Sequence, residues 1–226
     1  GVLTAVAMLR PQMIAAYREA ADVFMVDPYP VPNMPMTWLA DSLDEAASHI
    51  SRDRLWGVIQ AFGGDKWARH GWSRPPSYAE MRCLTYLAVV HGAQGLFYWN
   101  YPEVKADRTS WDAVKRIAAE LRQLQTWLVA PDAPRTLRLE MTSPFKADAN
   151  GGSAVHFCQK TQGSENLLIL VNVIDRPVSF YLYGFTPQTP WLSEMLQHHK
   201  SVVHDGNIRQ ELGPYEVRIY RYRRGA

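Results

Sequence analysis

Cysteine is almost absent from this chain. Cys83 and Cys158 are the only two among 226 residues, and they fall in separate segments, a predicted helix and a predicted strand. Neither a disulfide framework nor a zinc-binding spacing such as Cys-x-x-Cys is present. The histidines His198, His199 and His204 have no neighbouring acid or cysteine to complete a metal site, so we interpret them as surface residues. The sequence therefore predicts no metal site and no bound cofactor.

Long apolar runs and a strong charge of one sign are also missing. No run is long enough to span a bilayer, so we expect no membrane partner. With 24 basic and 22 acidic residues the formal net charge is only +2. A nucleic-acid-binding protein needs a broad basic face, which excludes that class of partner here. The dense basic cluster at the C-terminus is interpreted as a solvated strand face and tail: Arg218, Arg221, Arg223 and Arg224.

A start methionine and a targeting signal are missing as well. The chain opens at Gly1 inside an apolar run, with no basic segment in front of it. A secretory signal would show a basic region before its apolar run. We expect that further residues precede Gly1 in the natural protein. Targeting signals assign no compartment, and an extracellular or periplasmic location stays open.

Short apolar segments that end in polar residues are what the sequence does contain. Residues 23–27 read Val-Phe-Met-Val-Asp, and Pro28 and Pro30 follow at once. Proline has no N–H to donate, so it ends a sheet ladder. A short apolar run bounded by turn residues predicts a strand that is buried on both faces. The segments 55–62 and 96–101 follow the same plan, and 2–8 is a fourth, weaker strand candidate.

Helices are predicted between and after these strands. Arg10-Pro11 begins one that continues to Glu19, and an apolar stripe predicts another over 37–51. The capping-box sequence Ser77 to Glu80 begins a helix that ends at Gly92, and a long amphipathic helix follows over 110–128. The order β-α-β-α-β-α-β-α predicts parallel strands joined by right-handed crossovers.

After Pro134 the composition changes. The strand candidates there are short, are separated by Gly, Pro, Asn and Asp, and have no comparable helix between them: 137–141, 155–159, 167–173, 178–183 and 217–222. This pattern predicts an antiparallel β-sandwich. We therefore expect two domains, 1–132 and 133–226.

Four βα units are half of a (β/α)8 barrel, and four strands cannot close such a barrel. The strand at 2–8 would leave an edge that is apolar on both faces. We predict an α/β fold in which the C-terminal half of a (β/α)8 barrel is followed by an antiparallel β-sandwich. The first half of the barrel would lie in another segment or a second chain, or two copies would pair as a half-barrel dimer. An open four-stranded sheet is the alternative.

Polar and aromatic residues follow the predicted strand ends, which in a barrel all open on one face. Acids and amides hydrogen-bond hydroxyl groups, and aromatic rings cover the apolar face of a sugar. The sequence thus predicts a carbohydrate cleft. Its candidate residues come from three strand ends and from the loop 63–76: Asp27, Tyr29, Gln60, Trp67, His70, Trp72, Trp99, Asn100 and Tyr101.

Each candidate also has a structural interpretation. Asp27 before Pro28 is typical of a turn whose carboxylate accepts backbone N–H groups. Gln60 would satisfy buried backbone groups near the barrel rim, and Trp67 and Trp72 would cover the core. Glycoside hydrolysis needs two carboxyl groups. The acids that we place near the mouth of the barrel are Asp27 and Glu103. Glu103 lies in a loop, so we interpret it as a solvated residue rather than a catalytic one. We interpret His70 as a residue that forms hydrogen bonds within its loop.

The segment 22–30, Asp-Val-Phe-Met-Val-Asp-Pro-Tyr-Pro, resembles the sixth-strand region of TIM-barrel glycoside hydrolases. Segments 81–88 and 91–99 resemble the seventh helix and eighth strand of such proteins. Segment 212–220 is similar to the last strand of the β-sandwich that often follows these barrels. The resemblance implies that the strands at 2–8, 23–27, 55–62 and 96–101 are strands five to eight.

Retaining enzymes of this kind use an acid/base Glu after strand four and a nucleophilic Glu after strand seven. The resemblance implies that the first position is absent from this chain and that the second carries Gln60, which cannot act as a nucleophile. Either Asp27 takes part in a differently arranged catalytic pair, or the protein binds sugar without cleaving it.

We therefore predict a glycoside hydrolase-type protein that acts on a β-linked glycan and to which this chain contributes part of the sugar cleft. Asp27 is the catalytic or transition-state-stabilising candidate, and the aromatic and amide residues position the sugar. One alternative is a non-catalytic carbohydrate-binding or scaffold protein. Another is a barrel enzyme for phosphorylated substrates, which is disfavoured because no Gly-rich phosphate loop leads into a helix N-terminus.

Overall fold

The computed structural model describes residues 2–148 and 151–223. The chain divides into two compact units, 1–117 and 118–226. The division falls inside helix α6 (Arg108–Gln123). The two units are described separately below.

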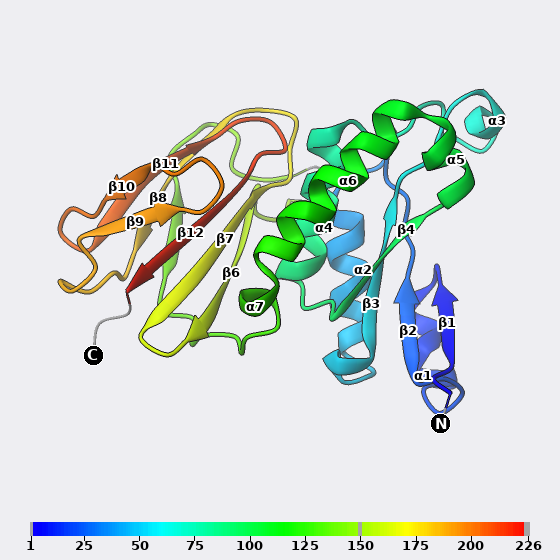
Figure 1. Cartoon of the computed structure of the whole chain (residues 1–226), viewed down its shortest axis with the longest axis horizontal. Helices are drawn as coiled ribbons and strands as arrows, with labels where there is room; N and C mark the ends of the chain where they lie inside the picture. Colours follow the sequence, from blue (N-terminus) through cyan, green and yellow to red (C-terminus); the bar gives the residue numbers. More distant parts are fainter. Residues whose placement is uncertain (1, 149–150, 224–226) are drawn as a thin grey trace. The chain divides into compact units, whose positions relative to one another are not determined.

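A parallel sheet forms the centre of the first unit (Figure 1). Its strands are β1 (Ala5–Met8), β2 (Val23–Val26), β3 (Leu55–Gln60) and β4 (Gly95–Trp99), and they lie side by side in chain order. All three neighbouring pairs are parallel, as predicted. Because the strands are parallel, the carboxyl ends of β2, β3 and β4 lie at the same edge of the sheet.

The helices of this unit follow the predicted order with shifted ends. Between β1 and β2 the chain forms only a 3-10 turn, η1 (Pro11–Met13), and the short helix α1 (Ile14–Tyr17). Helix α2 (Thr37–Ala47) contacts β2 and β3, and α4 (Tyr78–Val90) contacts β3 and α2. The predicted capping box is present at the start of α4. The remaining helical segments are η2 (Arg52–Arg54), α3 (Asp65–Ala68), α5 (Tyr101–Ala106) and α7 (Gln125–Leu128).

Several predicted boundaries are wrong. The strand expected over 96–101 ends at Trp99, because Asn100 caps the short helix α5. The single helix expected over 110–128 is broken near Leu124 into α6 and α7. The connection 63–76, expected to be a loop, contains the one-turn helix α3. Two of these differences concern the short helices α3 and α5, whose ends are set by local hydrogen bonds rather than by an apolar stripe.

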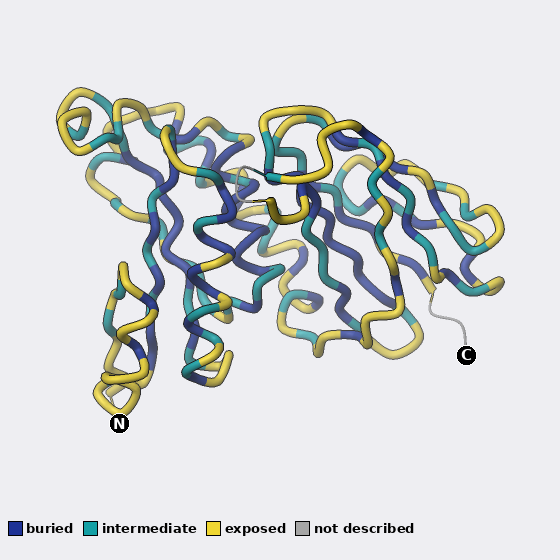
Figure 2. Tube along the Cα trace, turned by 180° about the vertical axis from the view of Figure 1, so that it is seen from behind, coloured by how far each residue is buried: buried dark blue, intermediate teal, exposed yellow. Residues whose placement is uncertain are grey.

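Burial is uneven across the parallel sheet. Strands β2 and β3 are almost entirely buried, as predicted. On β4, however, Phe97 is 46% exposed and Trp99 is 44% exposed. Residues Ala5 and Ala7 of β1 are exposed too, and Figure 2 shows this N-terminal part of the chain largely in yellow. The outer strands therefore carry apolar side chains that the described residues leave uncovered.

The second unit contains two antiparallel sheets within the described residues. One has the order β10-β9-β12-β7-β6 and the other β11-β8-β5. Their strands are β5 (Arg138–Met141), β6 (Val155–Gln162), β7 (Glu165–Asn172), β8 (Val178–Tyr183), β9 (Trp191–Glu194), β10 (Lys200–Val202), β11 (Asn207–Leu212) and β12 (Val217–Arg223). All five predicted strands are present, and β9, β10 and β11 were missed.

The two sheets share one apolar core. Leu168 and Leu170 of β7 lie in the same cluster as Val178 and Phe180 of β8, so side chains of both sheets meet between them. On β8 buried and half-buried residues alternate, which is the pattern of a sheet with one buried face, whereas β7 is buried on both faces. Ile208 and Leu212 of β11 belong to the same core.

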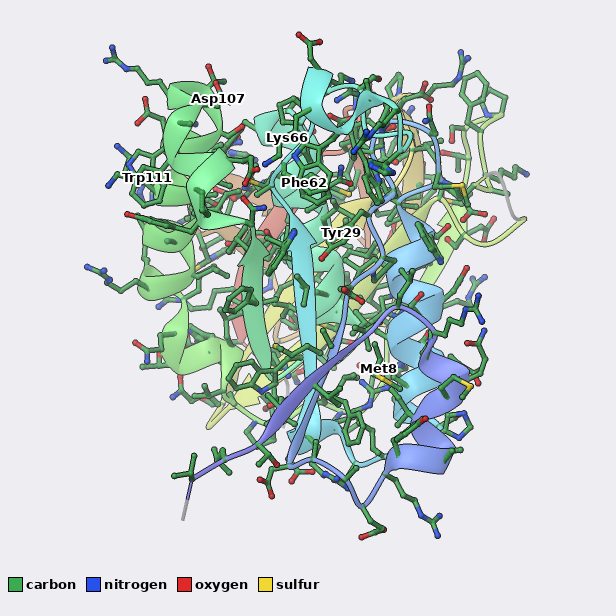
Figure 3. The ribbon with its side chains drawn as sticks, turned by 90° about the vertical axis from the view of Figure 1, so that its right-hand side faces the viewer. Met8, Tyr29, Phe62, Lys66, Asp107 and Trp111 are labelled. Carbon is green, nitrogen blue, oxygen red and sulfur yellow. The ribbon has the colours of Figure 1, made fainter. Side chains whose placement is uncertain are left out.

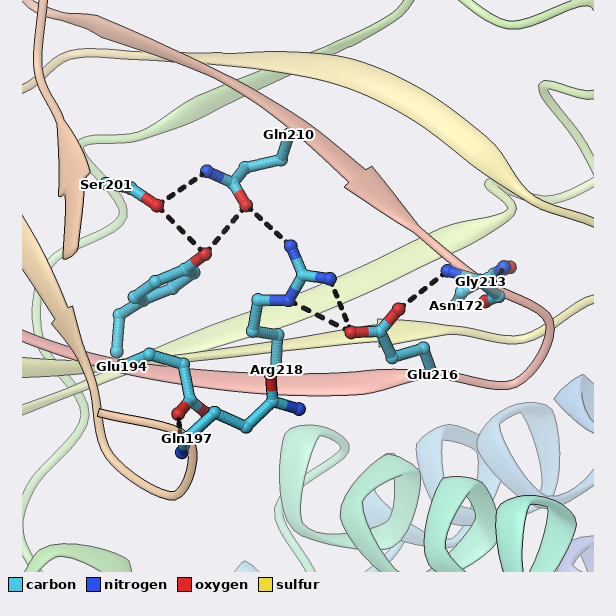
Figure 4. A network of polar contacts seen from close by, with 9 residues as sticks. Asn172, Glu194, Gln197, Ser201, Gln210, Gly213, Glu216 and Arg218 are labelled. Carbon is cyan, nitrogen blue, oxygen red and sulfur yellow. Dashed lines mark hydrogen bonds and ion pairs between the residues drawn. The ribbon is translucent and has the colours of Figure 1, made fainter. Parts of the chain in front are cut away.

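A polar network corrects the interpretation of Arg218, one of the four C-terminal arginines (Figure 4). The Arg218 guanidinium forms an ion pair with Glu216 and donates to Oε1 of Gln210 at 3.0 Å. The hydroxyl of Tyr220 donates to the same oxygen at 2.7 Å, and Nε2 of Gln210 donates to Ser201 at 3.1 Å. The Arg218 side chain is only 18% exposed, so it is not a solvated charge. Arg221 and Arg223 are exposed, as predicted, and Arg221 also pairs with Glu165; Arg224 lies outside the described residues.

Candidate functional site

Asp27 directly follows β2 at the carboxyl edge of the parallel sheet. Its Oδ2 accepts a long hydrogen bond of 3.4 Å from the Tyr29 hydroxyl. Its Oδ1 is buried and has no hydrogen-bond partner among the described residues. Burial raises the pKa of the Asp27 carboxyl above its ordinary value, and the bonds from Tyr29 and from its own backbone oppose that shift. Asp27 is thus a partly desolvated acid with one free oxygen.

Tyr29 holds this acid and is itself kept neutral. Burial, followed by the neighbouring charge of Asp27, raises the pKa of the Tyr29 hydroxyl well above its ordinary value. Its ring packs edge-on against Phe62, with centroids 5.0 Å apart, and against Trp72 at 5.8 Å. The indole N–H of Trp72 donates to the backbone carbonyl of Tyr29 at 3.0 Å. Tyr29 therefore positions the free oxygen of Asp27 from a packed aromatic support.

Gln60 ends β3 and is completely buried. Its Oε1 accepts the N–H of Val31 at 2.9 Å, and its Nε2 donates to the carbonyls of Val31 at 2.8 Å and Phe62 at 3.2 Å. Both ends of the amide are therefore bonded to backbone. This geometry matches the structural interpretation of Gln60: it ties the loop after β2 to the end of β3.

An aromatic cluster, defined here as Tyr29, Phe62, Trp67 and Trp72, forms beside this loop. Phe62 is its centre, with centroid distances of 4.7 Å to Trp67 and 5.3 Å to Trp72. In Figure 3, Tyr29 and Phe62 lie close together near the end of the strands. The indole Nε1 of Trp67 is buried and has no partner among the described residues. Sequence reasoning missed Phe62, because an apolar residue ending an apolar run carries no distinguishing signal.

The end of β4 supplies more exposed groups. Trp99 pairs with Gln60 in the sheet register, and its carbonyl accepts the N–H of Ala61 at 2.9 Å, which joins the ends of β3 and β4. The side-chain oxygen of Asn100 accepts the N–H of Glu103 at 3.1 Å as the cap of α5. Tyr101 is 57% exposed. The peptide bond between Trp99 and Asn100 is cis.

Charged side chains also lie on the segments that follow β3 and β4. Lys66 of α3 forms an ion pair with Glu103 of α5, so the long connection after β3 is joined to the segment after β4. His70 is exposed and its Nε2 accepts from the Arg69 guanidinium at 3.1 Å. The ring of Tyr101 lies 5.9 Å from that of Trp111, edge to face. The structure thus brings the candidates of β2 and the 63–76 connection into direct contact, and joins those of β4 through backbone and ion-pair contacts.

Within residues 2–148 and 151–223, no group of three or more His, Cys, Asp or Glu side chains is arranged to hold a metal ion. His198, His199 and His204 are exposed, as expected of surface residues. No helix in this described part of the chain is long and apolar enough to cross a membrane.

Comparison with known proteins identifies the fold. No family model and no curated protein sequence matches this chain. Among solved structures, an α-amylase from Anoxybacillus matches with a TM-score of 0.59 and 14% identity, over 98% of this chain and 52% of its own. A candidate α-galactosidase/melibiase from Bacteroides fragilis matches with a TM-score of 0.60 and 11% identity, over 93% of this chain and 44% of its own.

A third match is AmyP, solved in complex with maltose, with a TM-score of 0.55 and 11% identity, over 99% of this chain and 51% of its own. The chain therefore has a glycoside hydrolase-like fold and spans about half the length of these solved structures. The resemblance predicted from the sequence is confirmed at the level of the fold.

Proposed function

We propose that this chain is the C-terminal half of a (β/α)8 barrel with a trailing β-sandwich, and that it supplies part of the cleft of a carbohydrate-active enzyme. The fold similarity to glycoside hydrolases over about half their length supports the first part. The observation that carries the second is the free, buried oxygen of Asp27 at the carboxyl edge of the sheet, the position at which such barrels hold their reacting groups.

Asp27 acts in this proposal as a general acid. A carboxyl whose pKa is raised by burial stays protonated closer to neutral pH and can pass its proton to the oxygen of a leaving sugar. Tyr29 donates to Oδ2, and Oδ1 is the oxygen without a partner among the described residues. The second carboxyl group that hydrolysis requires would come from the other half of the barrel.

The remaining candidates divide into two roles. Trp99 and Tyr101 are exposed and would stack against sugar rings, with Asn100 beside them; the indoles Trp67 and Trp72 complete the sugar-facing wall. Gln60 acts as a positioning residue, because its amide is bonded to the loop that carries Tyr29.

The edge of the parallel sheet at β1 is the place where further barrel strands would dock. Beside β1, a hollow of about 590 Å³ is lined mainly by apolar side chains, among them Val6, Met8, Met13 and Tyr17. An apolar strand edge of this kind needs a neighbouring strand to cover it. We propose that the other barrel strands lie there, in another segment, a second chain or a second copy of this chain. The barrel part is taken as 1–132, because α6 and α7 continue the last βα unit, and the sandwich as 133–226.

The fold does not determine whether the glycosidic bond of the substrate is α or β, so an assay has to determine it. The hypothesis stated from the sequence is a β-linked glycan, whereas the similar structures include proteins with α-amylase and α-galactosidase names. The complete protein should therefore be assayed on matched α- and β-linked aryl glycosides and polysaccharides. Asp27→Asn is expected to reduce kcat by about 100-fold or more, the usual contribution of a general acid. Asp65→Asn, an exposed acid of α3, is the control and should change little.

A loss well below about 100-fold in the Asp27→Asn protein, with the control unchanged, would remove Asp27 from the chemical step. The aglycone gives a second readout. A general acid matters most for a poor leaving group, so the Asp27→Asn loss should shrink on a nitrophenyl glycoside.

A non-catalytic carbohydrate-binding protein is the second candidate. The observation that favours it is Gln60, which occupies the strand end where the resemblance implies a nucleophile and whose amide is fully used by backbone. This candidate predicts sugar affinity that Trp99→Ala abolishes, with no turnover of any glycoside by the complete protein.

A further inference from the structure

The second unit contains a separate small cavity. It has a volume of about 250 Å³ and lies between β7, β12, the residues before β5, and the 184–189 connection that follows β8. Its lining includes Asn166, Phe185, Thr186, Thr189 and Tyr222. The ends of β2, β3 and β4 contribute nothing to it, so any function of this cavity is independent of the proposed cleft.

Two residues that line this cavity, Asn166 and Tyr222, form a buried polar cluster with Gln159, which does not line it. The Tyr222 hydroxyl accepts the side-chain N–H groups of Gln159 at 2.7 Å and of Asn166 at 3.1 Å. All three residues are more than nine-tenths buried. Nevertheless, Oδ1 of Asn166 and Oε1 of Gln159 have no partner among the described residues. Buried polar atoms are almost always bonded, so the unbonded oxygen of Asn166, a residue that lines the cavity, indicates a missing partner.

The character of that partner follows from the lining. None of the cavity's residues is charged, and burial raises the pKa of Tyr222, so its hydroxyl also stays neutral. A charged ligand would lose its water without gaining a counter-charge. Asn166 Oδ1 requires a donor, and the Tyr222 hydroxyl, which already accepts two amides, has its own proton to donate. A neutral hydroxyl group both donates and accepts, so it suits both residues.

Apolar surface lies beside these polar groups. The Phe185 ring packs edge-on against Tyr222 with centroids 5.4 Å apart. Thr189 is held in place because its hydroxyl donates to the carbonyl of Arg223 at 2.7 Å. Thr186 is half-buried, and its hydroxyl oxygen lies 3.5 Å from that of Thr189, its one hydrogen-bond partner within the described residues. The cavity thus combines an aromatic wall with neutral donors and acceptors, which is how proteins hold a ring that has both C–H faces and hydroxyl groups.

We propose that this cavity binds one neutral hydroxylated ring, a sugar residue or cyclic polyol, with Asn166 as acceptor, Tyr222 as donor and Phe185 as the packing surface. A second hollow of about 490 Å³ shares Phe185, Thr186 and Thr189 with it and continues to Val203. A ligand longer than one ring therefore has room to extend along the surface of the same unit.

The test is an NMR titration of the isotope-labelled 226-residue chain with glucose, galactose, xylose and myo-inositol, and with glucuronate and phenol as comparison probes. We expect saturable shifts of the Asn166 side-chain amide and of the Phe185 and Thr186 backbone amides with at least one neutral ring. Glucuronate should bind more weakly than glucose, because the cavity offers its carboxylate no positive charge.

Two variants test the contacts. Asn166→Ala removes the acceptor and should weaken binding about fivefold to tenfold, the effect of one hydrogen bond. Thr186→Val keeps the side-chain shape and removes a wall hydroxyl, and should weaken binding about threefold. Gln188→Ala changes an exposed neighbour that does not line the cavity and should leave affinity unchanged. Dispersed spectra of each variant check the fold, and Thr186→Val keeps the test valid where Asn166→Ala fails to fold.

Three results would overturn the proposal. The first is the absence of saturable shifts at these residues with every neutral ring. The second is binding of phenol without binding of any sugar or polyol, which would make the site a purely apolar one. The third is an affinity that Thr186→Val and Gln188→Ala change equally. Shifts confined to residues 2–117 would support a cleft at the parallel sheet and reject this site, so the two proposals can fail separately.

Discussion

Replacing Gln60 by glutamate tests whether a single amide holds the loop after β2. In the native chain the Gln60 amide accepts from Val31 N–H and donates to the carbonyls of Val31 and Phe62. The introduced carboxylate can still accept the N–H, but it has nothing to donate. It would also face two carbonyl oxygens at a position with no solvent exposure.

The size of the effect follows from these contacts. Two buried carbonyls lose their donor, and each such loss costs about 1–3 kcal/mol. We therefore expect Gln60→Glu to lower the free energy of unfolding by about 2–6 kcal/mol at neutral pH. In the protonated form the carboxyl recovers one donated bond, so the cost at low pH falls to that of the one remaining carbonyl, about 1–3 kcal/mol.

The pH dependence has a defined sign. Burial and the facing carbonyls raise the folded-state pKa of the introduced carboxyl above its unfolded value of about 4.3. The smaller penalty therefore applies below that unfolded pKa, and stability is lost as the pH rises through the folded-state pKa. Urea unfolding of wild-type and variant chains at about pH 4 and about pH 7, followed by tryptophan fluorescence, measures the difference.

Gln188→Glu is the matched control, because Gln188 is exposed and the same chemical change there should cost under about 0.5 kcal/mol at either pH. A Gln60→Glu penalty that is the same at both pH values would show that the amide does not donate to these carbonyls. The reasoning on the loop and on the support of Tyr29 would then be refuted.

Two further substitutions test contacts that stabilise the first unit. The Glu80 carboxylate accepts hydrogen bonds from Arg74 at 2.7 and 2.8 Å and from the N–H of Ser77. Burial by itself would raise the pKa of Glu80, but these bonds outweigh it and lower that pKa. Glu80→Gln should therefore lower the free energy of unfolding by about 1–3 kcal/mol at neutral pH. The difference in stability between wild type and variant should become smaller as the pH falls through the lowered pKa of Glu80. Urea unfolding that shows the same loss of stability at every pH would contradict this prediction. Gly95→Ala should destabilise by about 1–3 kcal/mol, because a Cβ there would clash with the Trp56 indole; an unchanged melting temperature would show that the indole moves aside freely.

Local patterns explain why part of the fold was predictable. The apolar run before Asp27 and the Ser77–Glu80 capping box each fix backbone conformation within a few residues, and both appear where expected. The alternating pattern of β11, with Ile208, Gln210 and Leu212 buried, was a readable signal that was overlooked. Strand β10 has three residues, which is too short for any periodicity to show.

For the candidate site, too, one part could be predicted from the sequence and another could not. Strand ends could be located, so Asp27, Gln60 and Trp99 were placed at one edge from their positions alone. Their contacts could not be predicted. Gln60 bonds to Val31, 29 residues earlier in the chain, and Phe62 became the centre of the aromatic cluster only because the connection after β3 folds back over it.

By itself, the sequence determined the order of elements and the residues at each strand end, because hydrophobic period, proline and caps act on neighbouring residues. Only the tertiary structure decided which of those residues are already bonded and which are free. Gln60 and Asp27 both end buried strands as polar side chains, yet one is saturated by distant backbone and the other keeps an unbonded oxygen. Free hydrogen-bonding capacity is set by packing between remote segments, and that packing cannot be read from local pattern.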